Sequence, residues 1–157
     1  MDKRLIQDLK NALRNCNSAT SGFLQSIPSE NLTNKPFDPR FTSFAWEFAC
    51  LLRTRYCYLE GLKTGDLSFK DGPSVPNKED LMKDSKSQLL DKFSKTSNEL
   101  VEQIENLDTS EKVDMVNWLL QHERIHHGKL TLYHSKAGFD LPESFTKTWG
   151  ESNFSKE

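Results

Sequence analysis

Apolar side chains recur along this chain at intervals of three and four residues, with polar residues between them. This period matches the 3.6 residues of an α-helical turn. It predicts four helices, over about residues 3–24, 41–63, 78–107 and 109–136. No segment of strand length alternates apolar and polar residues, so no sheet is expected. Each helix must bury one apolar stripe, which predicts an all-α four-helix bundle.

The connections indicate how the helices follow one another. Residues 26–40 and 65–77 could each run the length of a helix, so either segment can join parallel neighbours. The junction at 107–109 is short, which predicts that the third and fourth helices are antiparallel neighbours. The tail over 139–157 holds scattered aromatic residues and is expected to pack as an extended cover. A length of 157 residues suits a single domain over the whole chain.

The composition limits the classes of function. The 21 basic and 23 acidic side chains nearly balance, which argues against a nucleic-acid-binding protein, because such proteins need a positive surface. No apolar segment approaches the roughly 20 residues that cross a bilayer, and the N-terminus does not resemble a signal peptide. Cys16, Cys50 and Cys57 are an odd number of cysteines without an export signal. We therefore expect a cytoplasmic protein with reduced thiols and no membrane partner.

The four histidines cluster in the fourth predicted helix. His122 and His126 are four residues apart, so their imidazoles lie one turn apart on one face, and both can bind one divalent ion. Neighbours on that face direct it towards the bundle interior; they are Met115, Leu119 and Tyr133. His127 points about 100° away and is expected at the surface or behind a ligand, and His134 is expected to be exposed. The alternative is a pair of histidines without a metal.

The second predicted helix offers the remaining ligand. A thiolate at Cys50 would complete a Cys-His-His set with one open position, the pattern of catalytic rather than structural zinc sites. Glu47, three residues earlier, could serve instead or bind as a second carboxylate. The alternative for Cys50 is a small buried apolar residue, which is how free cysteine usually behaves.

The string His122-Glu123-Arg124-Ile125-His126 also fits H-E-x-x-H, the signature of zinc proteases, in which the glutamate is the general base. The extended form of that motif requires a glycine and a third histidine where this chain has Lys129 and Leu132. No strand is predicted to hold a peptide substrate either, so a protease is disfavoured. Glu123 stays a candidate base for a metal-dependent hydrolase, although it lies about 100° around the helix from His122.

Two segments stand out together: residues 43–52 (SFAWEFACLL) and residues 122–130 (HERIHHGKL). They resemble the second-helix motif and the H-x-x-x-H-R/H-G-Q/K-L motif of the DinB/YfiT-like family. Residues 23–32 are similar to its first-helix exit. The resemblance covers about residues 5–142. It implies a four-helix bundle of up-down-down-up topology, in agreement with the long second connection.

The resemblance also implies a divalent metal, often zinc or nickel, held by three histidines. Two of these match His122 and His126, and the third position holds Cys50. Characterised relatives include bacillithiol S-transferases and a mycothiol-dependent maleylpyruvate isomerase, in which the metal activates a low-molecular-weight thiol. By the same resemblance we expect a small-molecule substrate and a homodimer.

Our leading hypothesis from the sequence is therefore a metal-dependent transferase in which Cys50, His122 and His126 hold the ion. Glu47 would assist them, and Trp46 and Tyr133 would line the pocket. Two alternatives stay open. One is a bundle that has lost its metal with the third histidine and acts as a binding or structural protein. The other is a metal-dependent hydrolase that uses Glu123 as its base.

Overall fold

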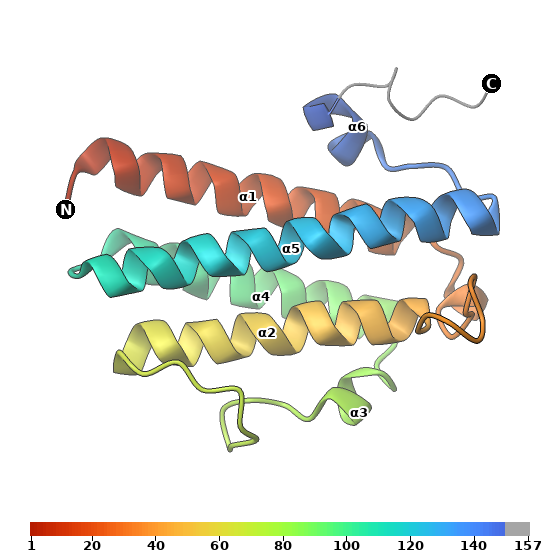
Figure 1. The fold of residues 1–157 in the computed structure, drawn as a ribbon, viewed down its shortest axis with the longest axis horizontal. Helices are drawn as coiled ribbons and strands as arrows, with labels where there is room; N and C mark the ends of the chain where they lie inside the picture. Colours follow the sequence, from red (N-terminus) through yellow and green to blue (C-terminus); the bar gives the residue numbers. More distant parts are fainter. Residues whose placement is uncertain (150–157) are drawn as a thin grey trace.

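The computed structural model describes residues 1–149, which form helices joined by loops (Figure 1). The four long helices are α1 (Lys3–Ser26), α2 (Phe44–Thr64), α4 (Lys86–Glu105) and α5 (Ser110–Ala137). The short ones are the 3-10 turn η1 (Ser29–Asn31), α3 (Lys78–Leu81) and α6 (Glu143–Trp149). The described residues contain no strand beyond one isolated bridge between Gly72 and Val75. The predicted all-α class and helical bundle are confirmed.

The long helices form a bundle in which α1 and α2 each pack against both α4 and α5. Helices α1 and α5 run in one direction, and α2 and α4 run in the opposite one (Figure 1). The long segment after Thr64 joins the parallel pair α2 and α4, and its short helix α3 packs against α2. The junction between α4 and α5 is as short as predicted, but these two helices lie diagonally across the bundle. The prediction that these two helices are antiparallel is right, and the prediction that they are neighbours is wrong. A short loop can also connect two helices across the end of a narrow bundle.

Local chemistry explains where the helices begin and end. Each of the four long helices begins at a side chain that accepts a hydrogen bond from a backbone N–H of the first turn; these residues are Asp2, Ser43, Ser85 and Thr109. Gly65 and Gly138 end α2 and α5 with φ angles of 82° and 76°, a left-handed conformation that glycine adopts without strain.

The third predicted helix, over 78–107, is two helices rather than one. Ser85 has an extended backbone and forms a capping box with Gln88, in which each side chain bonds the other residue's backbone N–H. This box starts α4 and separates it from α3. The periodic pattern continued through the break because Leu81 and Leu89 are both buried.

The predicted extended tail is wrong for residues 143–149, which form α6. This helix starts after Pro142 and packs against α1, where Phe145 contacts Phe23 with ring centroids 4.9 Å apart. Gly22 permits the close approach, because a Cβ there would meet Pro142 and Ser144. The rest of the predicted tail, residues 150–157, lies outside the described residues.

The buried apolar residues form two clusters, one towards each end of the bundle. A polar layer separates them, and each long helix contributes to it. Its buried members include Thr20 on α1, Arg55 on α2, Thr96 on α4 and Glu123 on α5. Among residues 1–149, none of the helices combines the length and apolar character that a membrane span requires. All three cysteines are free thiols, as expected.

Candidate metal centre

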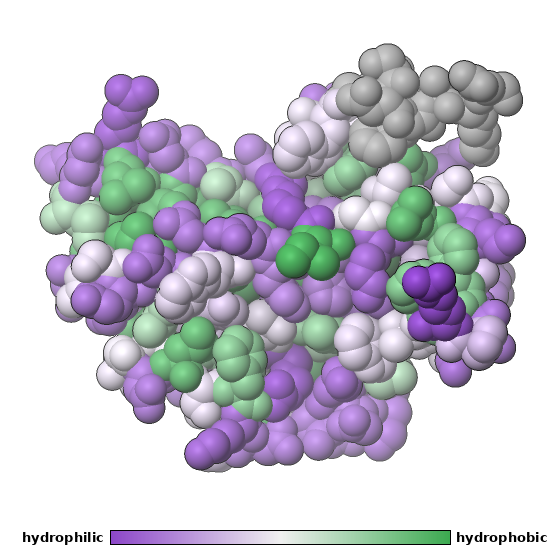
Figure 2. Space-filling model, in the orientation of Figure 1, coloured by the Kyte–Doolittle hydropathy of each residue, from purple (hydrophilic) through white to green (hydrophobic). Residues whose placement is uncertain are grey.

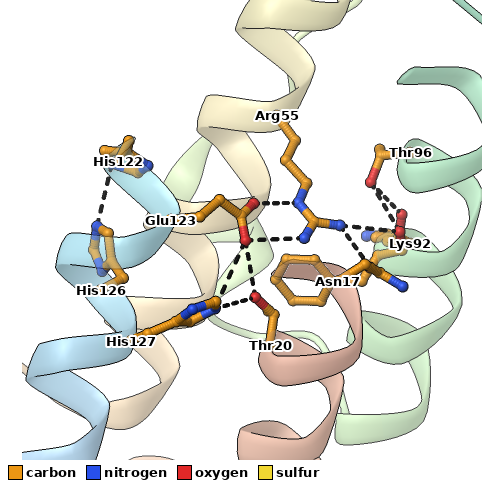
Figure 3. Close-up of polar contacts among 10 residues, drawn as sticks. Asn17, Thr20, Arg55, Lys92, Thr96, His122, Glu123, His126 and His127 are labelled. Atoms are coloured by element: carbon orange, nitrogen blue, oxygen red, sulfur yellow. Dashed lines mark hydrogen bonds and ion pairs between the residues drawn. The ribbon is translucent and has the colours of Figure 1, made fainter. Parts of the chain in front are cut away.

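Cys50 on α2 meets His122 and His126 on α5, two helices that pack directly against each other. The sulfur of Cys50 and one ring nitrogen from each histidine all lie within 4.8 Å of one another. The sulfur is 3.9 Å from Nε2 of His122, and the two Nε2 atoms are 3.2 Å apart. Figure 3 shows the two imidazoles one turn apart on α5 with their nitrogens facing each other. The two histidines predicted from their spacing and Cys50, the predicted third ligand, therefore converge.

These separations suit a tetrahedral ion. Zn–N bonds of about 2.0–2.1 Å and a Zn–S bond of about 2.3 Å require ligand atoms about 3.3 Å apart for two nitrogens and about 3.6 Å apart for nitrogen and sulfur. The observed 3.2 Å and 3.9 Å differ from these values by a few tenths of an ångström. One thiolate and two imidazoles are a donor set that zinc, nickel and copper all accept. The residues present therefore fit a divalent ion with three protein ligands.

Glu47 lies behind His126 rather than among the ligands. Its Oε2 accepts a hydrogen bond from Nδ1 of His126 at 2.6 Å, so Nε2 is the nitrogen left to face Cys50. The Oε1 atom accepts hydrogen bonds from Lys129 at 2.6 Å, Thr42 at 2.6 Å and Tyr133 at 3.3 Å. Both oxygens are therefore already bonded, and Glu47 fixes the ring of a candidate ligand, as carboxylates commonly do in metal sites. The structure places Glu47 behind His126 and outside the three residues that could hold an ion together.

Cys50, His126 and Glu47 shift one another's pKa values. Burial would raise the pKa of the Cys50 thiol, but hydrogen bonds and charge from His122 and His126 lower it to about 6. Burial would lower the pKa of His126, but Cys50 and Glu47 raise it to about 9. Burial would raise the pKa of Glu47, but hydrogen bonds from His126, Lys129 and Thr42 lower it to about 2. At neutral pH and without a metal, Cys50 is therefore a thiolate beside the imidazolium of His126, and the carboxylate of Glu47 accepts a hydrogen bond from that imidazolium.

A cavity of about 260 Å³ opens next to the cluster and has Cys50 in its wall. Its other lining residues come from α2 and from the segment between α2 and α4; they are Arg53, Thr54, Asp71, Asn77, Lys78 and Glu79. Arg53 links α2 to the segment that follows it, because its guanidinium donates hydrogen bonds to Asp71 and to the carbonyl of Phe69, each at 2.8 Å. The cavity therefore borders Cys50, one of the three residues of the cluster.

Trp46 and Tyr133 were predicted to line the pocket, and they occupy different places. The ring of Trp46 lies 6.5 Å from that of His126, with the ammonium groups of Lys78 and Lys129 at 4.7 Å and 5.4 Å from its centroid. It also lines a second cavity beside Phe41, of about 310 Å³. Tyr133 is buried, and its hydroxyl reaches Glu47. Trp46 thus borders the site, whereas Tyr133 supports it from behind.

Glu123 is fully buried and belongs to the polar layer (Figure 3). Both its oxygens face the guanidinium of Arg55, at 2.5 Å and 3.0 Å, and Thr20 donates a further hydrogen bond at 2.9 Å. Arg55 also donates to Asn17 at 2.8 Å. The adjacent ion pair keeps the pKa of Glu123 low although burial opposes this. A carboxylate held in this way does not face the Cys50 cluster, so its predicted candidacy as a base lacks geometric support.

The two remaining histidines are buried. This corrects the expected exposure of His134 and excludes the surface, one of the two places expected for His127. His127 contacts Thr20 through Nε2 at 2.7 Å, and burial lowers its pKa to about 4. His134 contacts the hydroxyl of Ser26 and the carbonyl of Leu130, each at 2.8 Å, and burial lowers its pKa as well. Neither joins the Cys50 cluster. The faces of α5 that carry them are covered because α5 packs against both α1 and α2.

The role of Arg55 was missed, although the sequence holds a signal for it. Arg55 falls between Leu52 and Leu59 in the apolar stripe of α2, and Glu123 falls after Leu119 in the stripe of α5. One charge of each sign inside the stripes of two helices predicts a buried ion pair. Lys129 and Thr42, which hold Glu47, gave no comparable signal, because either could have faced solvent.

A comparison with protein-family models finds no match for this chain. A comparison with curated proteins finds no match either.

Proposed function

We propose that this protein is a DinB-like enzyme that holds a divalent ion, zinc or nickel, through Cys50, His122 and His126. In this proposal the enzyme transfers a low-molecular-weight thiol to a small electrophile. The observation that carries the proposal is the convergence of one sulfur and two ring nitrogens within 4.8 Å, beside a cavity. The directions of the four long helices are those that the resemblance to the family implies (Figure 1).

The surrounding residues support a working site rather than three isolated side chains. Glu47 holds Nδ1 of His126, which keeps Nε2 directed at the cluster. Lys129 and Thr42 in turn fix Glu47. Three protein ligands leave room for a further ligand on the ion, which is the arrangement of catalytic zinc sites. A bound ion would supply Lewis-acid chemistry that lowers the pKa of an incoming thiol.

The cavity favours a small polar substrate. Its walls carry two cationic side chains, Arg53 and Lys78, and two anionic ones, Asp71 and Glu79. In the transfer, the thiol sulfur forms a bond to carbon, the leaving group departs with the bonding electrons, and the thiol proton passes to solvent. In this proposal the charged side chains of the cavity hold the thiol beside the electrophile.

The two alternatives receive less support. A bundle that has lost its metal would be favoured if the sulfur of Cys50 pointed away from the histidines. The sulfur instead lies 3.9 Å from Nε2 of His122, which is evidence against this alternative. A hydrolase needs Glu123 near the ion, and that carboxylate is bound by Arg55 in the polar layer.

The proposal is tested with zinc-loaded protein, glutathione as the thiol and chlorodinitrobenzene as the electrophile. We expect product formation above the uncatalysed rate, with Cys50→Ala inactive and Cys57→Ala active. Cys57 is a matched control because it is a buried free thiol on the same helix. A metal-loaded protein without activity towards this and related electrophiles would refute the transferase, and full activity in Cys50→Ala would refute the site.

A further inference from the structure

A cavity of about 430 Å³ lies between α1 and α4, on the opposite side of the bundle from the helix pair that carries the candidate metal centre. Helix α6, which stands against α1 in Figure 1, contributes Ser144 to the wall of this cavity. The hydroxyl of Ser144 donates a hydrogen bond to the carbonyl of Ser18 at 3.0 Å, which fixes α6 at this place. Three helices therefore surround the cavity.

The wall of this cavity is polar throughout. Apart from Gly22, every residue that lines it carries a hydroxyl, an amide or a guanidinium group. Pockets for small molecules are usually lined mostly by apolar side chains. Apolar residues do reach the surface elsewhere on this protein, and Figure 2 shows them as hydrophobic patches on the side of α5. The cavity between α1 and α4 thus favours a ligand that forms hydrogen bonds over much of its surface.

The serine hydroxyls of this wall are not used by the fold. A hydroxyl inside a helix can bond the carbonyl four residues earlier, as Thr96 and Thr131 do here. The hydroxyls of Ser18, Ser21 and Ser97 have no hydrogen-bond partner within residues 1–149. Ser97 is only 6% exposed, so a polar group without a partner lies deep in the cavity. Buried hydroxyls normally have a partner, and a ligand can supply it here.

Two further side chains offer donors to a ligand. The side-chain oxygen of Asn17 accepts a hydrogen bond from Arg55 at 2.8 Å, so the amide NH₂ group stays available (Figure 3). Arg14 is the only charged residue among the described residues of the wall. Lys10, one turn earlier on α1, pairs with Glu105, whereas Arg14 has no ion pair within residues 1–149. Its guanidinium can therefore bind a carboxylate or a phosphate with two hydrogen bonds.

We propose that this cavity binds a small polyhydroxylated anion, such as a sugar phosphate or a sugar acid. Each ligand hydroxyl can donate and accept hydrogen bonds, which matches the serine and amide groups of the wall. The guanidinium of Arg14 binds the anionic group, and the hydroxyl of Ser97 bonds the part of the ligand that lies deepest. This inference does not depend on the proposed transferase, because the cavity shares no residue with the Cys50 cluster.

Binding is tested by adding four probes to the purified protein and following its backbone amide resonances by NMR. The probes are glucose 6-phosphate, gluconate, glucose and inorganic phosphate. We expect at least one of the two hydroxylated anions to bind roughly tenfold more tightly than glucose or phosphate, because it uses both kinds of contact. The resonances that shift should belong to residues of α1 and α4 around the cavity. Comparing glucose 6-phosphate with gluconate shows whether the anionic group is a phosphate or a carboxylate.

Three results would overturn the proposal. One is the absence of binding by both hydroxylated anions up to about 10 mM, the range of weak ligands. Another is inorganic phosphate that binds as tightly as they do, which would mean that Arg14 attracts any anion. The third is a set of shifts that lies only outside this cavity.

Two variants test the residues that carry the proposal. Arg14→Gln should weaken binding of the hydroxylated anion roughly tenfold. Arg4→Gln is the matched control, because it removes the same charge from α1 outside the cavity, and it should leave the affinity unchanged. Ser97→Ala should weaken binding roughly threefold or more without lowering the melting temperature, because its hydroxyl has no partner in the fold.

The control for Ser97→Ala is Ser94→Ala, on the same helix but outside the cavity, which should bind as the wild type does. Wild-type affinity in both Arg14→Gln and Ser97→Ala would contradict the assigned site. A lower melting temperature in Ser97→Ala with unchanged binding would mean that the hydroxyl serves the fold instead of a ligand.

Discussion

The carboxylate of Glu47 lies 2.6 Å from Nδ1 of His126, while Nε2 of the same ring faces His122 at 3.2 Å. One imidazole thus joins a buried carboxylate to the candidate metal cluster. The hydrogen bond fixes which nitrogen is free to bind an ion, and it makes that nitrogen a stronger donor. Glu47 therefore supports the candidate site from behind His126 and is not among the three side chains that converge.

Removing the charge of Glu47 should weaken metal binding. Glu47→Gln keeps the shape of the side chain but loses the negative charge that polarises His126, and we expect zinc affinity to fall roughly 10- to 100-fold. Competition with a chromophoric chelator measures this affinity. Glu60→Gln, on the same helix but away from the cluster, should leave it unchanged. Equal affinities for Glu47→Gln and wild type would show that the carboxylate does not support the site.

The thiol of Cys50 should be the reactive one in the metal-free protein. Its pKa is lowered to about 6, whereas burial raises the pKa of Cys16 to about 12 and also raises that of Cys57. Because the thiolate is the nucleophile, alkylation by iodoacetamide should slow as the pH falls through 6 and level off above it. Peptide mapping by mass spectrometry identifies the modified cysteine. Zinc should protect Cys50, and modification of Cys16 at the same rate would contradict this ordering.

Zinc binding should release a proton at neutral pH. The pKa of His126 is raised to about 9, so its imidazole is protonated at pH 7 in the metal-free site and must lose that proton to bind an ion. Cys50, with a pKa of about 6, is already largely a thiolate there. Calorimetry in buffers of different ionisation enthalpy should therefore report about one proton from His126 per zinc. The number should fall as the pH rises above 9, and a count independent of pH would contradict these protonation states.

Replacing only one partner of the buried Arg55–Glu123 ion pair should destabilise the fold more than replacing both partners. Arg55→Met leaves the Glu123 carboxylate buried and unpaired, and we expect a loss of about 3–5 kcal/mol in the free energy of unfolding. The double variant Arg55→Met with Glu123→Leu removes both charges and should be more stable than Arg55→Met. Urea unfolding measures each. Additive losses in the double variant would show that the two groups do not interact.

The sequence predicts most of this fold because its signals are local. The stripes of α1, α2 and α5, the stop at Gly65 and the spacing of His122 and His126 are all visible in the pattern. Convergence of Cys50 with the histidines followed from the resemblance and the ligand chemistry. The break at Ser85 is not visible because the apolar period continues past this cap. Helix α6 is not visible because its seven residues, with Phe145 alone buried, are too few to show a period.

The surroundings of the site could not be predicted in the same way. The hydrogen bonds that Lys129 and Thr42 make to Glu47 depend on how α2 and α5 rotate against each other. The burial of His127 and His134 depends on the cover that α1 gives to α5. These contacts depend on how the helices pack against one another, and the periodicity of a single helix does not predict that packing.

The most direct test of the metal centre is the metal content of untagged protein, purified without chelators or added metal and measured by elemental analysis. We expect about one equivalent of zinc or nickel in the wild type, since the cluster offers one set of ligands. Cys50→Ala and His126→Ala should lose the metal, and Cys57→Ala should keep it. A wild type without metal that also fails to bind added zinc, or a Cys50→Ala variant with full metal content, would show that these three side chains do not form a metal site.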